Sequence, residues 1–356
     1  MTHQEISHQR LVSQKLYKTS QCSPEEIVKH FGAMQAQDYA MSKWAVGSRC
    51  DASEREIEEA INSGKIIRTH ILRPTWHLVA AEDIYWMLDL SGPQVKRLFA
   101  SLAKEHGYDE KKLDQVNSAI EKLLSGNNHL TRDEIMQELN IQKNAGDLSP
   151  VIVMMNAELD GLVCNGKMKG KQITYALLEE RVSKPKTQLT KEEALAKLAQ
   201  RYFESHGPAT AADFSHWSGF SVTNCKSAIN TIKLQLSRIT IDNQEYWFGK
   251  NHSGLDNFRE SVHFLPAFDE FLISYKNRES SISLEHQSKV FTKNGIFKPV
   301  ILENGKVIGT WKRTSKKDYV KIETEFFNSI DGNKKQDLFK GINSFGNYME
   351  NKIVIE

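Results

Sequence analysis

Two glutamines near the N-terminus, Gln35 and Gln37, have the type and spacing that most suggest chemistry. They lie in Met34-Gln35-Ala36-Gln37-Asp38, directly after an apolar helical stripe. On a helix, residues two apart point about 200° apart, whereas on an extended segment they share one face. Two amides on one face offer acceptors and donors that can hold a water molecule and orient its lone pair toward an electrophile. The alternative is a pair of surface glutamines at a helix end, with Asp38 in a turn.

Other catalytic signatures are absent from the sequence. It contains no Walker loop, no GxGxxG, no HExxH and no GxSxG motif, which argues against the enzyme classes that use them. The 12 histidines are dispersed and show no metal-ligand spacing, so we expect no metal and no cofactor. The four cysteines are far apart and form no CxxC, which predicts buried free thiols rather than disulfides or a zinc ribbon.

Composition and charge narrow the class of protein. The 356 residues are 39% hydrophobic and 26% charged, which is ordinary for globular chains and allows two or three cores. No apolar run approaches the roughly 18 to 20 residues of a membrane span, and the N-terminus does not resemble a signal peptide. We therefore expect a cytoplasmic protein with no membrane partner.

The net charge of +2 does not by itself indicate nucleic acid, but the distribution of charge does. Residues 288–321 contain nine Lys and Arg against two Asp and Glu. Such a basic segment predicts a surface for phosphates. A solvated, lysine-rich strand edge that discourages strand pairing is the alternative.

Three segments repeat one order of elements: a capping signal, a helix, a second helix and a β-hairpin. That order is typical of a winged helix-turn-helix. The capping boxes begin at Ser23, Thr131 and Thr210. The predicted helices are 54–61, 113–124, 150–159, 192–203 and 222–234, and the predicted hairpins are 66–79, 162–176 and 239–248. The second hairpin contains a glycine-rich wing, 165–171, with three lysines.

After about Val262 the pattern changes to strands. Strands are predicted at 297–303, 306–312 and 319–324, with Asn304-Gly305 as a hairpin turn, followed by an amphipathic helix over 335–349. The sequence thus predicts an α+β fold of three tandem winged helix-turn-helix units followed by a C-terminal β-rich, barrel-like domain. The expected domains are 1–105, which contains the glutamine pair, 106–185, 186–260 and 261–356.

Several landmarks occur in an order that is specific when taken together. They are Met34–Asp38 with Trp44–Gly47, Arg68–Val79, Gly207–Thr210 with Asp213-Phe214 and Trp217–Gly219, Leu265–Glu270, and Gly309–Arg313. In these the chain resembles the AlkZ-like DNA glycosylases, a bacterial winged-helix family related to YcaQ, from near residue 10 to near residue 325. Pro74 departs from the pattern, because many relatives have glycine there.

The resemblance implies three winged helices curving around duplex DNA, completed by a β-barrel. It also implies a monofunctional glycosylase that excises alkylated purines, with N7 or N3 adducts, and that unhooks interstrand crosslinks. The family's motif is a glutamine, any residue, then glutamine, which Gln35 and Gln37 match. The implied partner is double-stranded DNA with alkylated purines, with no obligate protein partner.

The candidate DNA contacts are basic or polar residues in three regions. They are Arg68, Arg73, Thr75 and His77 in the first hairpin, Lys167, Lys169 and Lys171 in the second wing, and Lys298, Lys312 and Arg313 in the C-terminal region. A structural role for His77 is the alternative, and carboxylate pairing is the alternative for the arginines. Trp44, Trp217, Trp311 and Phe268 are expected to pack in the core, and Asp269 to fix local hydrogen bonds.

Two other functions remain open from the sequence. A non-catalytic winged-helix DNA-binding protein or transcriptional regulator is the main alternative, because a fold does not determine a chemistry. A protein-interaction scaffold is the other.

Overall fold

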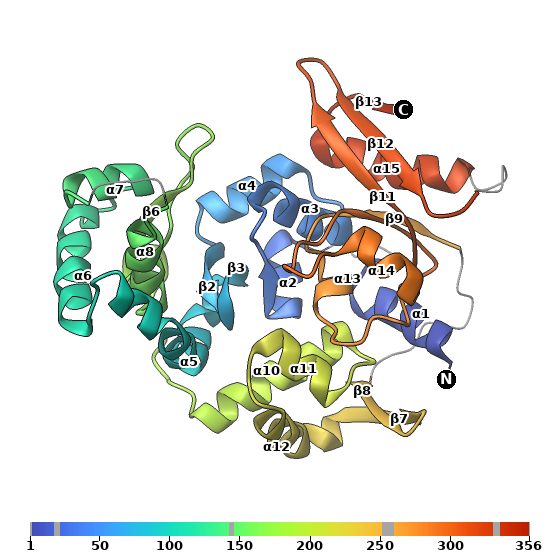
Figure 1. The fold of residues 1–356 in the computed structure, drawn as a ribbon, viewed down its shortest axis with the longest axis horizontal. Helices are drawn as coiled ribbons and strands as arrows, with labels where there is room; N and C mark the ends of the chain where they lie inside the picture. Colours follow the sequence, from blue (N-terminus) through green and yellow to red (C-terminus); the bar gives the residue numbers. More distant parts are fainter. Residues whose placement is uncertain (1, 18–21, 142–145, 251–259, 330–334, 356) are drawn as a thin grey trace. The chain divides into compact units, whose positions relative to one another are not determined.

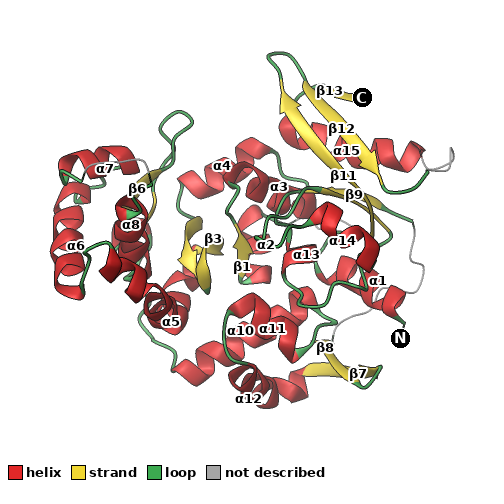
Figure 2. Cartoon of the chain, in the orientation of Figure 1, coloured by secondary structure: helices red, strands yellow, loops and turns green. Residues whose placement is uncertain are grey.

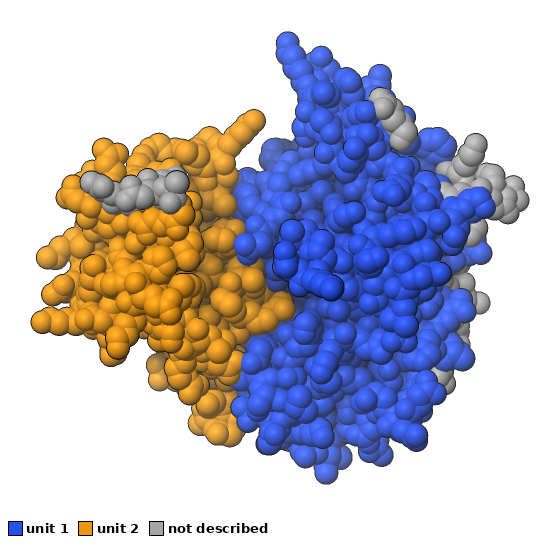
Figure 3. Space-filling view, in the orientation of Figure 1, with its two compact units in different colours: residues 1–58, 195–356 blue, residues 59–194 orange. Residues whose placement is uncertain are grey.

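The computed structural model describes residues 2–17, 22–141, 146–250, 260–329 and 335–355. The chain forms two compact units: unit 1 comprises Met1–Glu58 and Leu195–Glu356, and unit 2 comprises Glu59–Ala194 (Figure 3). The chain contains both helices and strands (Figure 2), which confirms the predicted α+β class. Among the described helices none is long and apolar enough to cross a membrane.

Unit 1 begins with four helices and one short strand (Figure 1). They are α1 (His3–Ser13), α2 (Pro24–Phe31), β1 (Ala33–Gln35), α3 (Tyr39–Cys50) and α4 (Glu54–Asn62), the last of which continues into unit 2. Ser23 forms the predicted capping box with Glu26, and Pro24 occupies the first turn of α2. Asp38 caps α3 by accepting a hydrogen bond from Met41 N at 3.1 Å. These caps fix where the chain leaves one helix and enters the next.

The third predicted winged helix forms in unit 1. Its elements are α10 (Lys191–His206), which begins in unit 2, α11 (Ala211–Ser218), α12 (Val222–Ile232), η2 (Lys233–Gln235), β7 (Leu236–Ile241) and β8 (Gln244–Gly249). Thr210 and Asp213 form the predicted capping box at the start of α11. An isolated bridge between Ala209 and Trp247 adds the short third strand.

The C-terminal part of unit 1 is a curled five-stranded half-barrel. Its elements are β9 (Val262–Leu265), α13 (Glu270–Ile273), α14 (Leu284–Val290), β10 (Val300–Glu303), β11 (Lys306–Ser315), β12 (Val320–Phe326), α15 (Lys335–Met349) and β13 (Ile353–Ile355). The strand order is β13-β12-β11-β10-β9, and β12 and β13 alone are parallel. Asn304 and Gly305, with φ of 49° and 79°, form the predicted hairpin turn.

Helix α15 closes the core of the half-barrel. Its Phe345 ring lies 5.1 Å from the Trp44 ring of α3 and 5.1 Å from the Trp311 ring of β11. Both indole N–H groups donate to backbone carbonyls of β9, at Phe264 and Leu265. The two tryptophans are therefore packing residues, as predicted.

Unit 2 contains the first hairpin and the second winged helix. Its elements are β2 (Ile66–Ile71), β3 (Arg73–Ala80), η1 (Ala81–Asp83), α5 (Ile84–Glu105), α6 (Glu110–Leu124), β4 (Leu130–Thr131), α7 (Arg132–Glu138), α8 (Ser149–Leu159), β5 (Val163–Asn165), β6 (Thr174–Leu177) and α9 (Leu178–Arg181). The strands β4-β6-β5 form the small sheet of a winged helix, and residues 166–173 form its wing. Thr131 makes the predicted capping box with Glu134.

Some elements differ from the expectations. The 22-residue helix α5 was not expected, because Gly92 and Pro93 together resemble a break, yet both lie inside it. A Cβ on Gly92 would lie 2.9 Å from Leu159 O, so glycine allows α5 to approach α8 closely. The predicted strand over 297–303 begins only at Val300, because Lys298 N bonds to Val290 O and Pro299 has no N–H to donate. Two short helices, α13 and α14, lie where only strands were expected.

The four cysteines are free, as expected. Cys50, Cys164 and Cys225 are buried, whereas Cys22 is half-buried.

Candidate active site

The glutamine pair lies between a helix end and a helix start in unit 1. Gly32, with φ of 79°, ends α2 and turns the chain into β1, whose last residue is Gln35. Gln37 follows in a bend before the cap of α3. Gln35 is half-buried and Gln37 is exposed. Gln35 is thus at the end of an extended segment and not at a helix end, whereas Gln37 lies beyond the strand in the bend.

A buried carboxylate holds the backbone of Gln35. Glu270 Oε1 accepts a hydrogen bond from Gln35 N at 2.6 Å, across 235 positions of sequence. Glu270 is only 1% exposed. Its other oxygen, Oε2, accepts from Trp217 Nε1 at 3.1 Å and from Ser274 Oγ, and lies 3.5 Å from His206 Nε2. This carboxylate therefore ties the glutamine motif to α10, α11 and α13.

The surroundings keep Glu270 ionised. Burial raises the pKa of its carboxyl, but the interaction with the nearby His206 imidazole and the hydrogen bonds from Ser274 Oγ and the Gln35 backbone outweigh burial and bring this pKa to about 2. Burial lowers the pKa of His206, which favours a neutral imidazole. A negative charge thus lies directly behind the Gln35 backbone at neutral pH.

The neighbouring carboxylate, Asp269, anchors the same turn. Its two oxygens accept from Arg49 at 2.8 and 2.9 Å, and both side chains are buried. Asp269 Oδ1 also accepts from Phe271 N at the start of α13. Asp269 does fix local hydrogen bonds, as expected, whereas Phe268 is half-buried with φ of 57° and is not a full core residue.

The candidate residues of the first hairpin belong to unit 2. Thr75 and His77 lie on β3, where alternate side chains share a face, and His77 is fully buried while Thr75 is half-buried. His77 Nδ1 is hydrogen-bonded to Thr75 O at 2.9 Å, which favours the structural role for His77. Arg73 is half-buried at the start of the same strand.

Arg68 belongs to a cluster that sequence patterns did not predict. Its guanidinium lies over the Trp76 ring, 4.5 Å from the centroid. The Trp76 Nε1 donates to Glu158 Oε1 at 3.4 Å, and His70 Nδ1 pairs with the other oxygen of this buried carboxylate. Arg68 is itself buried, so its position is fixed by its neighbours, unlike that of an exposed surface cation.

The three lysines of the wing differ in their contacts. All three are exposed. Lys169 Nζ pairs with Glu134 Oε1 at 2.5 Å. Lys167 donates its backbone N–H to His129 Nδ1 at 2.8 Å. Lys171 lines a cavity together with Arg68, so the structure brings together two of the predicted DNA contacts from different hairpins.

The three candidate DNA contacts of the C-terminal region also differ in their surroundings. Lys298 is exposed. Lys312 pairs across the sheet with Glu323 at 3.1 Å. Arg313 packs on α15, with its guanidinium 5.7 Å from the Phe345 ring centroid and Nη1 3.5 Å from Met349 Sδ.

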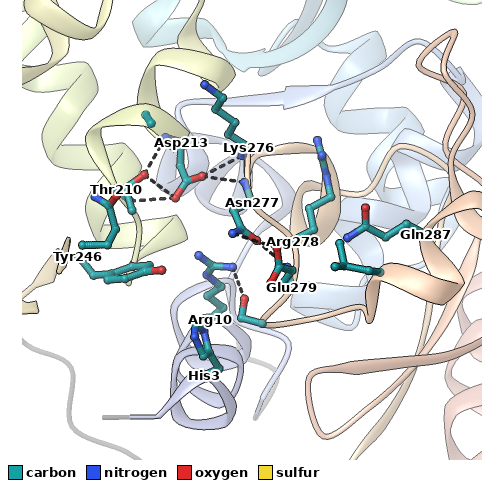
Figure 4. Close-up of a pocket in the computed structure, with 14 residues that line it drawn as sticks. His3, Arg10, Thr210, Asp213, Tyr246, Lys276, Asn277, Arg278, Glu279 and Gln287 are labelled. Carbon is teal, nitrogen blue, oxygen red and sulfur yellow. Dashed lines mark hydrogen bonds between the residues drawn. The ribbon is translucent and has the colours of Figure 1, made fainter. Parts of the chain in front are cut away.

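A cavity of about 400 Å³ in unit 1 contains none of the predicted site residues (Figure 4). Buried Arg10 lines it and donates to Ser280 Oγ at 2.8 Å. Asp213 accepts from Thr210 and from the backbone of Lys276, as the dashed lines in Figure 4 show. With Glu279 it places two carboxylates in the lining, beside three cations, Arg10, Lys276 and Arg278. Among the described residues there is no group of His, Cys, Asp and Glu that could hold a metal ion.

Sequence reasoning missed Glu270 as part of the glutamine site. The residue lies in the landmark Leu265–Glu270, but no local pattern links this segment to Gln35. Trp217 was expected only to pack, whereas its indole also donates to Glu270. Both contacts join segments that are distant in sequence, so they become visible only in the folded chain.

Comparison with known proteins identifies the family. The model of the AlkZ-like DNA glycosylase family matches residues 28–342. An interstrand DNA cross-link repair glycosylase from Streptomyces sahachiroi is 22% identical over 318 residues, which are 85% of each chain. The solved structure of Streptomyces sahachiroi DNA glycosylase AlkZ shares the fold, with a TM-score of 0.82 and 19% identity over 100% of both chains. Because the family match covers most of its length, the chain belongs to the AlkZ-like DNA glycosylase family, whose members hydrolyse N-glycosyl bonds in DNA.

Proposed function

We propose that this enzyme hydrolyses the N-glycosidic bond of alkylated purines in duplex DNA, with an attacking water positioned by Gln35 and Gln37. An N7- or N3-alkylated purine is positively charged, so its glycosidic bond is already weak and the leaving base needs little acid catalysis. Breaking the bond develops an oxocarbenium-like sugar, as in glycoside hydrolysis. What remains for the protein is to place a water below C1′ and to stabilise positive charge on the sugar.

Neutral amide oxygens can do both tasks. Each carbonyl accepts a hydrogen bond from the water and directs its lone pair toward C1′, and each is a dipole with its negative end toward the sugar. A strong general base is unnecessary when the electrophile is this reactive.

The observation that carries the proposal is the hydrogen bond from Gln35 N to buried Glu270. It fixes the backbone at the first glutamine, which limits where the side chain of Gln35 can point. The ionised carboxylate also adds a negative potential near the motif, and such a potential favours an oxocarbenium-like transition state over the neutral sugar. Glu270 is a positioning residue in this scheme, since it contacts Gln35 and not the substrate.

The finer assignments follow from the same proposal. The substrates include interstrand crosslinks as well as monoadducts. The similarity to an interstrand DNA cross-link repair glycosylase of Streptomyces sahachiroi supports the crosslinks. The enzyme acts on chromosomal DNA in the nucleoid. Its domains are the four expected from the sequence. The phosphate contacts are proposed among Arg68, Arg73, Thr75, Lys167, Lys171, Lys298, Lys312 and Arg313. Buried His77 and Lys169, which pairs with Glu134, are not among them.

The test is a single-turnover excision assay. Duplex DNA with one N7-alkylguanine, and in parallel a nitrogen-mustard crosslink, is incubated with excess wild type or with Gln35→Ala/Gln37→Ala, and abasic sites are cleaved with alkali. We expect release by wild type and its loss in the double variant, with an unchanged melting temperature. Full excision by the folded double variant would remove the glutamines from the mechanism. No release by wild type, with DNA still bound, would favour the non-catalytic regulator.

A further inference from the structure

Unit 2 contains a cavity of about 320 Å³ with a strongly basic lining. Three cations line it, Arg68, Arg132 and Lys171, against one carboxylate, Asp133. The other lining residues are Trp76, Thr131, Gln172, Ile173 and Tyr175. The three cations come from β2, α7 and the wing, so the folded unit brings together charges that are more than 30 residues apart in sequence. With three cations against one carboxylate, the formal charge of the lining is positive.

One wall of this cavity is rigid. Arg68 is 6% exposed and its guanidinium lies over the Trp76 ring. Trp76 is in turn held by Glu158, and its ring lies 4.3 Å from that of His70, which pairs with the same carboxylate. Because its contacts hold this arginine in place, binding an anion beside it requires little further ordering.

The other two cations are available for a ligand. Arg132 is half-buried and Lys171 is exposed, and neither forms an ion pair with any residue that the structure describes. Lys169, two positions from Lys171, instead pairs with Glu134 at 2.5 Å. The wing thus contains one lysine turned to the cavity and one neutralised by a carboxylate, although the sequence presents them as equivalent.

We infer that this cavity binds a backbone phosphate of duplex DNA. The inference rests on the proposed function for its substrate, DNA, and adds the place and the residues of one contact. The planar guanidinium of Arg132 can donate two parallel hydrogen bonds to phosphate oxygens, and Lys171 adds a point charge. The volume admits the phosphate together with part of its sugar. The contact positions the duplex and carries no sequence information.

The experiment measures binding of an undamaged duplex as a function of salt, by fluorescence anisotropy. The proteins are wild type, Arg132→Ala, Lys171→Ala, the double variant, and Lys169→Ala as the matched control with the same change of charge on the same wing. A lost phosphate contact lowers the slope of log K against log salt by about 0.9. The ratio of wild-type to variant affinity should therefore fall about 3.5-fold between roughly 50 and 200 mM salt for each single variant of the cavity, and about 12-fold for the double variant.

The control decides between a pocket and a diffuse basic surface. We expect Lys169→Ala to keep the wild-type slope, and all variants to keep the wild-type melting temperature. Equal slope changes for Lys169→Ala and Lys171→Ala, or no change for Arg132→Ala and Lys171→Ala, would overturn the inference. Calorimetric titration with inorganic phosphate separates the two sources of a phosphate group. Binding of free phosphate that is lost in the double variant, while duplex binding is unaffected, would assign the cavity to a small anion and also overturn the inference.

This readout is independent of catalysis. If the protein does not excise bases but the slopes differ as expected, the proposed glycosidic hydrolysis is wrong and the phosphate contact is supported. If excision is normal but the slopes do not differ, the hydrolysis is supported and the phosphate contact is wrong.

Discussion

Replacing Glu270 with glutamine tests whether a buried charge positions the glutamine motif. The wild-type carboxylate accepts from Gln35 N on one oxygen and from Trp217 and Ser274 on the other. An amide has only one oxygen. If that oxygen faces Gln35 N, the NH₂ group opposes the Trp217 N–H, and if the amide is flipped, the NH₂ group opposes Gln35 N. Either orientation loses at least one hydrogen bond to a charged acceptor and places two donors against each other.

The magnitude follows from that lost contact. A hydrogen bond to a charged group contributes about 1.5 to 3 kcal/mol. If the lost energy raises the barrier, the single-turnover rate constant falls roughly 10- to 150-fold, at about 1.36 kcal/mol for each factor of ten. The affinity for the duplex should stay unchanged, because Glu270 is buried behind Gln35 and does not reach DNA. The loss is therefore expected in the rate constant and not in binding.

The assay is excision of N7-alkylguanine under single turnover, with duplex affinity and melting temperature measured on the same samples. Ser274→Ala is the matched control, because it removes one donor but keeps the charge and the contact with Gln35, so its rate should fall much less. Since the pKa of Glu270 is about 2, the deficit of Glu270→Gln should be constant from about pH 5 to about pH 8. A Glu270→Gln variant that melts earlier but excises at the wild-type rate would show that Glu270 only stabilises the fold.

Three further predictions concern stability, measured by urea unfolding. Asp269→Asn breaks a buried ion pair and should lower the free energy of unfolding by about 3 to 5 kcal/mol. Glu323→Gln breaks an exposed pair and should leave the free energy of unfolding nearly unchanged. Burial lowers the pKa of His263 from 6.5 to about 4, so the unfolded chain binds more protons and stability falls as the pH drops below 6.5. Between about pH 7 and pH 5 wild type should lose about 2 kcal/mol more than His263→Leu, and equal losses would contradict the burial argument. Gly92→Ala should destabilise by about 1 to 3 kcal/mol through its clash with Leu159 O, partly offset by about 1 kcal/mol of helix propensity, and a stabilised variant would show that α5 can move away.

Local patterns predicted much of the fold because they depend on neighbouring residues. The three capping boxes, the Asn304-Gly305 turn and the helix over 335–349 all form as expected. Each is encoded within about four residues or by one helical period, so no distant contact is needed to recognise it. Helix α5 shows the converse: Pro93 argues locally for a break, and packing against α8 overrides it.

Only part of the candidate site could be predicted from the sequence, because some of its contacts join segments that are distant in sequence. The resemblance pointed to Gln35 and Gln37, and the structure has Gln35 at the end of a strand and Gln37 in the bend that follows. The residues that act on the pair come from elsewhere in the chain. Glu270 is 235 positions from Gln35, and a buried carboxylate with neutral donors leaves no periodic or compositional trace. The distinction between Lys169 and Lys171 likewise depends on where Glu134 lies after folding.

The burial of α8 bears on the choice between an enzyme and a regulator. In a winged helix that reads sequence, the second helix of the helix-turn-helix places its side chains in the major groove. In unit 2 that helix is α8, and every one of its residues except Val151 is buried, with α5 and β2 among its neighbours. It has no face to offer to base edges. What unit 2 exposes instead is the wing and the cavity beside Lys171, where we infer a phosphate contact. Phosphates are the same at every sequence, so such a contact carries no sequence information. An enzyme that must find rare lesions in any sequence context needs such binding. The base contacts of a transcriptional regulator cannot come from the buried α8 and would have to come from α12 in unit 1, which has an exposed face.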